Sequence, residues 1–436
     1  MKFFLPDWED RVDPGFSFEK DKFSEKHETD PYSNDMYAHQ LFSPSLPYDG
    51  ILVSLSIFQS KLKLKDHGSN EILIRHSKQI KDYLKIPKKS SLEVLGDCGA
   101  FSYVSKKDPP DFFSSENVAN IYDKLGFDYG VSVDHMALSS YMIKDKETGK
   151  RKQVPISQSE RERRVRITLK NAKDFLDIHK EKGYKFKPIG AAQGYDRKSY
   201  VKSVKELVGM GYDYIGIGSL VRHSSKEILS ILEEIEPELE GAWLHLFGVL
   251  RPSYLTKFED LGVVSFDSAS YLRKAWLRSG QNYLTSDNEW YAAIRVPYSD
   301  NTTIRKSSKK RGISIEQLVS LERRAIQSLK MYESGQASIE RTLRTVVKYD
   351  SLLTRNSSDG SNLQERYRRT LDDKPWKKCN CEVCKEMGID VLIFRGSNRN
   401  KRRGFHNSWV FNNILKDSTK NPSTKGKYKI NYTSIV

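Results

Sequence analysis

The sequence has little cysteine and no long apolar run, and both absences narrow the class of protein. Only 4 cysteines occur in 436 residues and three are clustered, which excludes a disulfide-stabilised secreted domain. No apolar run approaches the length of a membrane-spanning helix. The opening MKFFLPDWEDRVDP has acidic residues and prolines where a signal peptide needs an apolar stretch. We therefore expect a soluble intracellular protein with no membrane partner.

The chain is basic, and its positive charge is concentrated in short segments. Lys and Arg number 73 against 57 Asp and Glu, a net charge of +16. Basic clusters attract nucleic-acid phosphates because binding releases condensed counterions, although a basic surface also occurs without such a partner. A first cluster contains Arg161, Arg163, Arg164 and Arg166. We expect the other two to contact nucleic acid through Arg305, Lys306, Lys309, Lys310 and Arg311, and through Arg399, Arg402 and Arg403.

Short apolar runs recur along the chain with helical patterns between them. Runs of this length are typical of strands buried on both faces of a parallel sheet. Eight such strands with helical crossovers predict an α/β fold, a TIM-type (β/α)₈ barrel. An open doubly wound sheet is the alternative, which the lack of a Gly-rich dinucleotide fingerprint after the first strand disfavours. The predicted strands are Ile51–Phe58, Leu92–Gly96, Tyr129–Val133, Phe186–Ala192, Tyr214–Gly218, Trp243–Val249, Val263–Phe266 and Ile389–Phe394.

Amphipathic stretches between these runs predict the outer helices. Gly126, Gly183, Gly211 and Gly262 follow four of them, where a left-handed helix cap favours glycine. The predicted helices are Asn70–Leu84, Glu116–Leu125, Glu160–Lys182, Lys198–Met210, Lys226–Glu234 and Tyr254–Leu261.

The prediction divides the chain into five segments. Residues 1–47 form an irregular N-terminal cover, and 48–275 hold the first seven barrel strands. Residues 276–375 form a mostly helical insert between the seventh and eighth strands. Its long helical stretch, roughly Ser314–Tyr349, is either a surface hairpin or a substrate clamp, and the RKSSKKR segment before it favours the clamp. Residues 376–416 hold a metal site, the last strand and a C-terminal helix, and 417–436 form a polar tail.

Polar residues stand at the ends of several predicted strands, where catalytic groups gather in such barrels. Asp97, Asp134 and Asp267 end three strands, Gln193 ends a fourth, and Gly218 leaves backbone open to a ligand. One acid in such a place is usually a cap, but three acids and an amide favour a functional site. Two carboxylates in one pocket can cleave a glycosidic bond by double displacement. A third acid with an amide can read the polar edge of an extruded purine.

A second signal is the C-x-C-x-x-C motif of Cys379, Cys381 and Cys384, which His406 follows. Three thiolates and an imidazole close a tetrahedral Zn²⁺ shell, so we expect structural zinc. An iron–sulfur cluster is disfavoured by the histidine, and a metal-free cysteine cluster is the other alternative. A zinc-dependent hydrolase would need an open metal position. Two more histidines are expected to pack or to support neighbours rather than bind metal: His135 and His245.

Together these segments resemble the tRNA-guanine transglycosylase superfamily, in the family's order from about Gly50 to Leu415. DCGAF resembles its DSGGF segment, GAAQGYDRKSY its VQGG stretch, and YDYIGIGSL the glycine-rich segment after that stretch. HLFGVLRP resembles YLMGVGTP, SFDSASYLRKA the nucleophile region, and CNCEVC with the later HN the zinc site. The resemblance implies a barrel enzyme that exchanges a guanine in nucleic acid through a covalent aspartyl–glycosyl intermediate.

The resemblance also assigns a role to each matched residue. Asp267 matches the covalent nucleophile, and Asp97 the second acid that moves the proton. Asp134 and Gln193 match the base-reading pair, and Gly218 a backbone contact near it. The implied zinc ligands are Cys379, Cys381, Cys384 and His406.

Departures from the tRNA enzymes indicate a DNA-modifying branch. SASYLRK after Asp267 lacks the family's proline, and VDHM replaces an FDEC-like segment. With the opening FLPDWEDRVDP, these features resemble the DpdA-type branch, which is associated with inserting 7-cyano-7-deazaguanine (preQ0) into DNA. We therefore expect DNA and a 7-deazaguanine base as substrates, in the cytoplasm of a bacterial or phage-infected cell.

Two other functions stay open. One is a tRNA transglycosylase of the queuosine or archaeosine type, and the other is a non-catalytic nucleic-acid-binding subunit on the same scaffold. A helper protein that opens the duplex would fit the DNA reaction, because extruding a paired base costs a few kcal/mol. No motif in the sequence requires such a helper.

Overall fold

The computed structural model describes residues 1–59, 62–64, 72–74, 78–145, 149–277, 280–352 and 358–420. These residues fold into two units. Unit 1 comprises Met1–Trp8, Tyr48–Ala269 and the residues from Lys416 onward, and unit 2 comprises Glu9–Pro47 and Ser270–Leu415. Among the described helices, none has the length and low polarity that crossing a bilayer requires.

Unit 1 is a closed barrel of parallel strands, which confirms the predicted TIM-type fold. Side chains from six strands fill its interior, Phe4, Leu52, Leu95, Val131 and Ile189 among them, so the barrel has a packed floor rather than a pore. Around the barrel the strands are β1 (Lys2–Pro6), β12 (Val263–Asp267), β11 (Trp243–Leu246), β10 (Tyr214–Ile217), β9 (Lys187–Ala192), β6 (Tyr129–Val131), β5 (Glu93–Asp97) and β2 (Gly50–Ser54).

The identity of one barrel strand differs from the prediction. Lys2–Pro6, expected in an irregular cover, is β1 and pairs in parallel with both β12 and β2. Its Phe3 and Phe4 are fully buried. The sequence pattern did not predict a strand here, because the apolar run is short and an acidic, proline-containing stretch follows it directly. Ile389–Phe394 is not a barrel strand, because it forms the 3-10 helix η7 (Gly388–Leu392) and the two-residue β16 (Ile393–Phe394). The segment 276–375 therefore follows the last barrel strand and is not an insert within the barrel.

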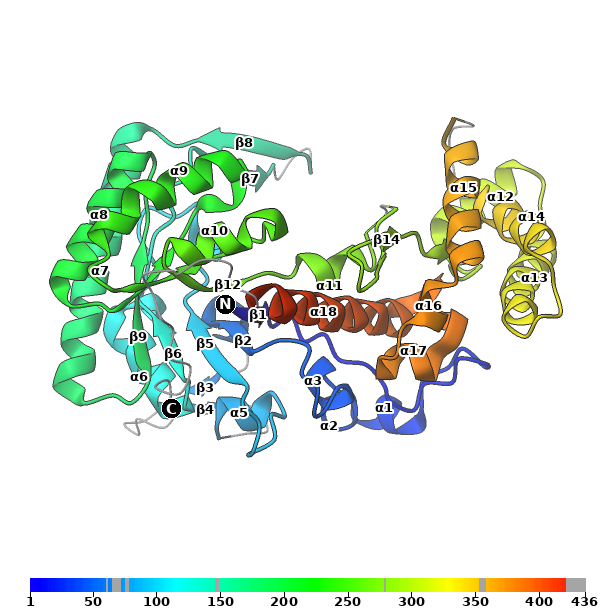
Figure 1. Ribbon diagram of the computed structural model, residues 1–436, viewed down its shortest axis with the longest axis horizontal. Coiled ribbons are helices and arrows are strands. Elements are labelled where there is room, and N and C mark those ends of the chain that lie inside the picture. The colour runs from blue at the N-terminus through cyan, green and yellow to red at the C-terminus, as the bar shows by residue number, and fades with distance from the viewer. Residues whose placement is uncertain are drawn as a thin grey trace. The chain divides into compact units, whose positions relative to one another are not determined.

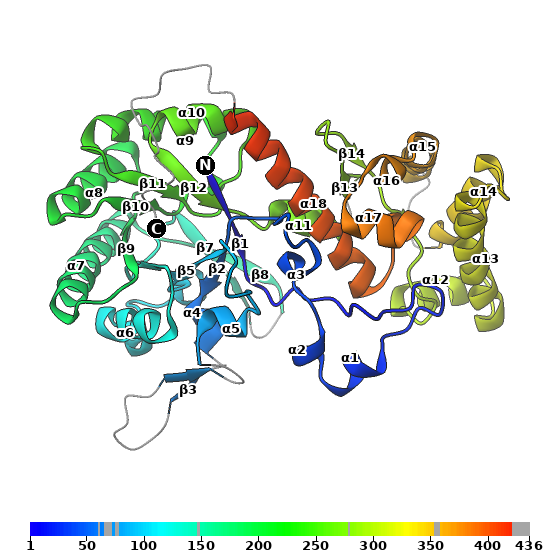
Figure 2. The same cartoon turned by 60° about the horizontal axis from the view of Figure 1, so that its bottom comes forward.

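Helices form the outer layer of unit 1 (Figure 2). The predicted helix Asn70–Leu84 is wrong, since Ile72–Ile74 is a strand and the helix is only Ile80–Tyr83; residues 70, 71 and 75–77 lie outside the described residues. Gly126 and Gly183 end two helices in the left-handed conformation, with φ of 72° and 62°. The connecting elements are α4 (Leu55–Phe58), β3 (Leu62–Leu64), β4 (Ile72–Ile74), α5 (Ile80–Tyr83), η2 (Ala100–Tyr103), η3 (Asp111–Phe113), α6 (Ser115–Leu125), β7 (Ser140–Lys144), β8 (Arg151–Pro155), α7 (Gln158–Lys182), α8 (Arg197–Met210), η4 (Leu220–Arg222), α9 (Ser225–Ile235), η5 (Glu236–Glu238), η6 (Pro252–Tyr254) and α10 (Leu255–Asp260).

Unit 2 is mainly helical, and α18 (Gly396–Lys420) lies beside α16 (Pro375–Lys378) and α17 (Glu382–Met387) (Figure 1). The stretch Ser314–Tyr349 is a hairpin of two packed helices, because Gly335 breaks it with a φ of 78°. Of the predicted polar tail, Asp417–Lys420 continue α18 and 421–436 lie outside the described residues. The other elements are α1 (Glu25–Thr29), α2 (Pro31–Asn34), α3 (Ala38–Leu41), α11 (Ser270–Lys274), β13 (Tyr283–Leu284), β14 (Trp290–Tyr291), β15 (Ile294–Arg295), α12 (Thr302–Lys310), α13 (Ile315–Glu333), α14 (Ile339–Asp350), α15 (Ser358–Asp373), α16 (Pro375–Lys378) and α17 (Glu382–Met387).

Candidate active site

The five residues expected at strand ends all lie at the carboxyl end of the barrel. Asp97 is the last residue of β5 and Asp267 the last residue of β12. Gln193 and Gly218 directly follow β9 and β10, and Asp134 lies shortly after β6. Because all the strands are parallel, these side chains start from the same rim of the barrel.

Three carboxyl groups meet at this rim. A carboxylate oxygen of Asp97, the Sγ atom of Cys98 and a carboxylate oxygen of Asp134 lie within 4.8 Å of one another. Burial, and to a lesser extent the negative charges of Asp134 and Asp267, together raise the pKa of Asp97 from 3.8 to about 8. The Gly99 N–H donates to Asp97 Oδ2 at 3.0 Å and partly opposes this rise. Asp97 therefore keeps its proton at neutral pH.

Asp134 and Gln193 are held by a buried chain of hydrogen bonds. The Cys98 thiol donates to Asp134 Oδ1 at 3.1 Å, and Gln193 Nε2 donates to Asp134 Oδ2 at 2.5 Å. Ser219 Oγ in turn donates to Gln193 Oε1 at 2.6 Å, and the Tyr103 hydroxyl donates to the Asp134 carbonyl at 2.9 Å. These contacts fix an acceptor and an amide donor side by side, which suits recognition of a purine edge.

The structure gives Gly218 a steric role. A Cβ at this position would lie 2.2 Å from Gln193 Nε2, so any larger residue would push that amide out of its present position. Its N–H donates to the Ala192 carbonyl at 3.0 Å, and its carbonyl accepts from Tyr200 at 2.9 Å. The backbone contact with a base that the sequence suggested stays a prediction.

Asp267 is oriented by its neighbours in β11 and the loop after it. The Gly248 N–H donates to Asp267 Oδ1 at 2.9 Å, and His245 Nε2 lies 3.3 Å from the same oxygen. The other ring nitrogen of His245, Nδ1, is 2.7 Å from Ser265 Oγ, which also contacts the Tyr214 hydroxyl. Oδ2 of Asp267 makes no hydrogen bond within the described part of the chain. One carboxylate oxygen is therefore anchored and the other is available.

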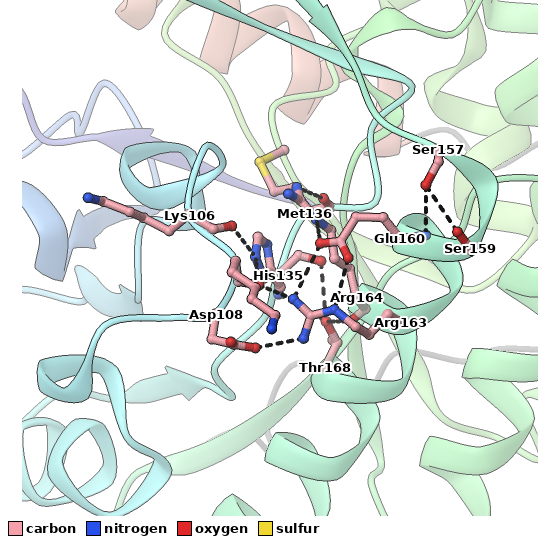
Figure 3. Close-up of polar contacts among 11 residues, drawn as sticks. Lys106, Asp108, His135, Met136, Ser157, Ser159, Glu160, Arg163, Arg164 and Thr168 are labelled. Atoms are coloured by element: carbon pink, nitrogen blue, oxygen red, sulfur yellow. Dashed lines mark hydrogen bonds and ion pairs between the residues drawn. The ribbon is translucent and has the colours of Figure 1, made fainter.

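A second network holds the loop that carries Asp134 (Figure 3). The His135 N–H donates to Thr168 Oγ1 at 2.9 Å, and His135 Nε2 lies 3.1 Å from the Lys106 carbonyl. Arg164 donates to the Met136 carbonyl at 3.1 Å. Helix α7 thus ties together the loops after β5 and β6. Of the first basic cluster, Arg163 and Arg164 serve this network, and both bind Glu160 at 2.9 Å.

Several of these contacts could not be predicted from the sequence. Cys98 adjoins Asp97 in DCGAF, which was the available signal for its place in the site. The contact of His245 with Asp267 depends on the pairing of β11 with β12, where His245 faces Ser265. Ser219 holds a left-handed φ of 63°, which its side chain does not reveal.

Three arginines expected to contact nucleic acid are instead buried in unit 2. Arg399, Arg402 and Arg403 are at most 1% exposed. Arg399 pairs with the carboxylates of Asp21 and Asp390, so its charge is already neutralised within the protein and does not face a phosphate. The prediction for these three residues is therefore wrong. Arg402 and Arg403 also donate to other groups of unit 2, among them the Glu386 carboxylate and the carbonyl oxygens of Asp13, Ala275 and Val391.

The burial of Arg399 predicts a structural phenotype. Arg399→Ala should destabilise unit 2 by about 3 kcal/mol, because it removes a buried guanidinium and leaves Asp21 and Asp390 with one cationic partner each, Arg395 and Lys330. Exposed Arg305→Ala is the matched control and should change the unfolding free energy by less than about 0.5 kcal/mol. Urea unfolding followed by tryptophan fluorescence measures both, and equal stability of the two variants would contradict the assignment.

The other expected nucleic-acid residues are exposed. Arg305, Lys306, Lys309 and Lys310 lie on helix α12, and Arg311 caps its C-terminus. The nearby Ile304 and Ser308 are buried, so the basic residues occupy the outward face. Contact of these five residues with nucleic acid stays a prediction.

The cysteine motif and His406 form one cluster within unit 2. The Sγ atoms of Cys379, Cys381 and Cys384 lie 3.6, 3.3 and 3.4 Å from His406 Nδ1. Ligands of a tetrahedral zinc ion are about 3.5 Å apart, given Zn–S and Zn–N bonds of about 2.3 and 2.0 Å. The Nε2 atom of His406 is 2.8 Å from the Leu284 carbonyl, which leaves Nδ1 free to bind a metal. The cluster could therefore hold a tetrahedral metal ion.

Comparison with known proteins identifies the family. Residues 73–393 match the family described as queuine tRNA-ribosyltransferase (TGT). The chain belongs to the tRNA-guanine transglycosylase family. It is therefore a guanine transglycosylase, a pentosyltransferase, and the resemblance of its segments to this family is confirmed.

Two relatives place this guanine transglycosylase more closely. A DNA-guanine transglycosylase of Salmonella montevideo is 35% identical over 418 residues, which cover 95% of this chain and 96% of the relative. A tRNA-guanine(15) transglycosylase of Methanocaldococcus jannaschii is 29% identical over 139 residues, 30% of this chain and 20% of that protein. The near-complete match with the first supports the branch of the family that the sequence departures indicated. A non-catalytic subunit on this scaffold is not supported.

Proposed function

We propose that this transglycosylase replaces guanine in DNA with 7-cyano-7-deazaguanine (preQ0) through a covalent intermediate on Asp267. The observation that carries the proposal is the meeting of Asp97, Asp134 and Asp267 at one barrel rim, where the charges of Asp134 and Asp267 both act on Asp97. The preference for DNA over tRNA rests on the near-complete match with the Salmonella relative.

The first half of the reaction uses Asp267 as nucleophile. Its free Oδ2 attacks C1′ of the deoxyribose and forms an ester as the bond from C1′ to N9 of guanine breaks. Gly248 and His245 keep Oδ1 in place during this step. Asp97, protonated at neutral pH, gives its proton to the departing guanine and becomes a carboxylate.

The second half reverses these roles. Asp97 accepts the N9 proton of the incoming 7-deazaguanine, whose N9 attacks C1′ and releases the Asp267 carboxylate. Two inversions at C1′ restore the original configuration. Asp134 accepts from the donor groups on the guanine edge, and Gln193 donates to its carbonyl oxygen. Both bases present this edge, so one pocket serves both half-reactions.

We further propose that the cluster of Cys379, Cys381, Cys384 and His406 holds zinc in a structural role. All four ligands come from the chain, so no position is left for a substrate. Bound there, zinc would fasten the segment before α17 to helix α18.

Incorporation of a labelled base tests the choice of polymer. Wild-type protein is incubated with labelled guanine or preQ0 and either duplex DNA or tRNA, and nucleosides are analysed by mass. Label in DNA, and preQ0 in place of guanine, are the expected results. Label that enters tRNA alone would reject the DNA proposal and favour the queuosine or archaeosine type of activity. If DNA reacts only after a cell extract is added, a helper protein is required.

The raised pKa of Asp97 predicts a coupled loss of activity and stability at high pH. Base exchange should fall as the pH passes about 8, because the general acid loses its proton. The folded state holds this proton more tightly than the unfolded chain does. The contribution of the protonated Asp97 to the free energy of unfolding is therefore complete below about pH 4 and is lost as the pH rises through about 8. Each pKa unit by which the folded state differs from the unfolded chain corresponds to about 1.4 kcal/mol of unfolding free energy.

Asp97→Asn separates these two effects. The variant should exchange base poorly, yet exceed wild type in unfolding free energy by a margin that grows between pH 5 and pH 8. Asn keeps an oxygen for the Gly99 N–H, so the local fold is retained. Chemical unfolding at several pH values provides the measurement. Parallel profiles for the variant and wild type would show that Asp97 does not carry a raised pKa.

A further inference from the structure

The hairpin of β7 and β8 leaves the barrel rim directly after the loop that carries Asp134. Figure 1 shows it as a two-stranded ribbon that projects from the barrel. Its side chains are largely exposed, including the apolar Met142 at 49% and Ile143 at 37%. Two isolated strands are marginally stable in water, so this ribbon needs either firm anchors or a partner.

The root of the hairpin is firmly anchored to the active site. Arg222 donates to the Ser140 carbonyl at 2.9 Å, and Gln153 Nε2 donates to Ser140 Oγ at 2.7 Å. Arg222 belongs to η4, which directly follows Gly218 and Ser219. On the other side, Arg164 of α7 holds the Met136 carbonyl (Figure 3). The hairpin is thus fixed at its base while its arm stays uncovered.

The register of the hairpin places like charges together. Lys144 pairs with Arg151, and Ile143 pairs with Lys152. Directly opposed residues share one face of a ribbon, so Lys144 and Arg151 lie on one face and Lys152 on the other. In the described part of the chain, Lys144, Arg151 and Lys152 form no salt bridge. Like charges directly opposite each other are destabilising, and a polyanion would remove that cost.

We propose that the β7–β8 hairpin is a duplex-binding ribbon that lies in a groove of DNA beside the extruded guanine. The major groove admits a two-stranded ribbon, and phosphates border it on both sides. Basic residues on both faces of the hairpin match that arrangement. Lys144 and Arg151 would face the phosphates of one DNA strand, and Lys152 would face those of the other DNA strand. Met142 lies on the face of Lys144 and Arg151, and Ile143 lies on the face of Lys152, so each face also carries an exposed apolar side chain. This inference rests on the proposed action on DNA.

A triple variant, Lys144→Ala with Arg151→Ala and Lys152→Ala, tests the ribbon. Each phosphate contact contributes about 0.9 to the slope of log affinity against log salt, so the slope should fall by about 2.7. Affinity for a duplex should drop at least tenfold at about 0.1 M salt, and the apparent KM for duplex DNA should rise while that for the base stays constant. Fluorescence anisotropy gives the affinities, and thermal melting verifies the fold of each variant.

A matched control removes the same charge from the opposite end of the barrel. Lys180, Lys182 and Lys185 are exposed and stand just before β9 begins, so their triple alanine variant should bind duplex DNA like wild type. Equal losses in both variants, or a hairpin variant with wild-type affinity and slope, would overturn the ribbon. A loss confined to single-stranded DNA would do the same. Failure of the proposed function would show separately, as wild-type protein that transfers no labelled base into DNA.

Discussion

Replacing Asp267 with asparagine should abolish base exchange and leave the fold intact. Asn is nearly isosteric and keeps an oxygen for the Gly248 N–H, but it cannot form the ester with C1′. Loss of a covalent nucleophile costs on the order of 10⁴-fold or more in turnover. DNA affinity should stay within about threefold of wild type, because the groups assigned to DNA binding lie elsewhere. Incorporation of labelled guanine into DNA measures the turnover.

Two further variants make this result interpretable. Asp267→Ala excludes recovery of activity through deamidation of the asparagine. Asp213→Asn alters an acid at the amino end of β10 that pairs with Lys187 at 3.2 Å, and it should retain wild-type exchange. Wild-type turnover in either Asp267 variant would refute the nucleophile.

Loss of one cysteine ligand should give the largest effect on stability. Cys381→Ser removes a thiolate that lies 3.3 Å from His406 Nδ1 and that also accepts from the Cys384 N–H. Binding of structural zinc is coupled to folding and contributes several kcal/mol or more. We expect about one zinc per wild-type chain, little in the variant, and a melting temperature of unit 2 lowered by roughly 10 °C or more.

Cys98→Ser is the matched control for this experiment. Cys98 is a buried cysteine of the barrel, where it contacts Asp134 and Tyr103, outside the cluster of unit 2. Its replacement should leave the zinc content unchanged in elemental analysis. Full zinc content and wild-type melting in Cys381→Ser would contradict the metal assignment.

The barrel and the positions of its strand-end residues were largely predictable from sequence. Strands buried on both faces give continuous apolar runs, and Asp97 and Asp267 stand at the ends of two of them. Because parallel strands share one carboxyl rim, the order of the chain was enough to bring these acids to one end. The strand Lys2–Pro6 escaped prediction because its apolar core is very short, whereas Ile389–Phe394 imitated a strand because it is buried inside unit 2.

The buried arginines show where sequence reasoning fails. A basic cluster predicts a phosphate-binding surface only if its charges reach solvent, and burial is decided by partners far along the chain. Arg399 pairs with Asp21, which is 378 positions away. The same holds for His245, whose contact with Asp267 depends on the pairing of adjacent strands. Such pairings between distant residues cannot be predicted from charge counts or sequence motifs.

Trapping the intermediate tests the central proposal most directly. Wild-type protein is mixed with duplex DNA without an incoming base, denatured, and separated on a denaturing gel, and the linked peptide is identified by mass spectrometry. We predict a protein–DNA adduct on the peptide that contains Asp267. Added guanine should release the DNA from this adduct, and Asp267→Asn should form none. An adduct on another residue, or base exchange with no adduct under any quench, would contradict the proposal.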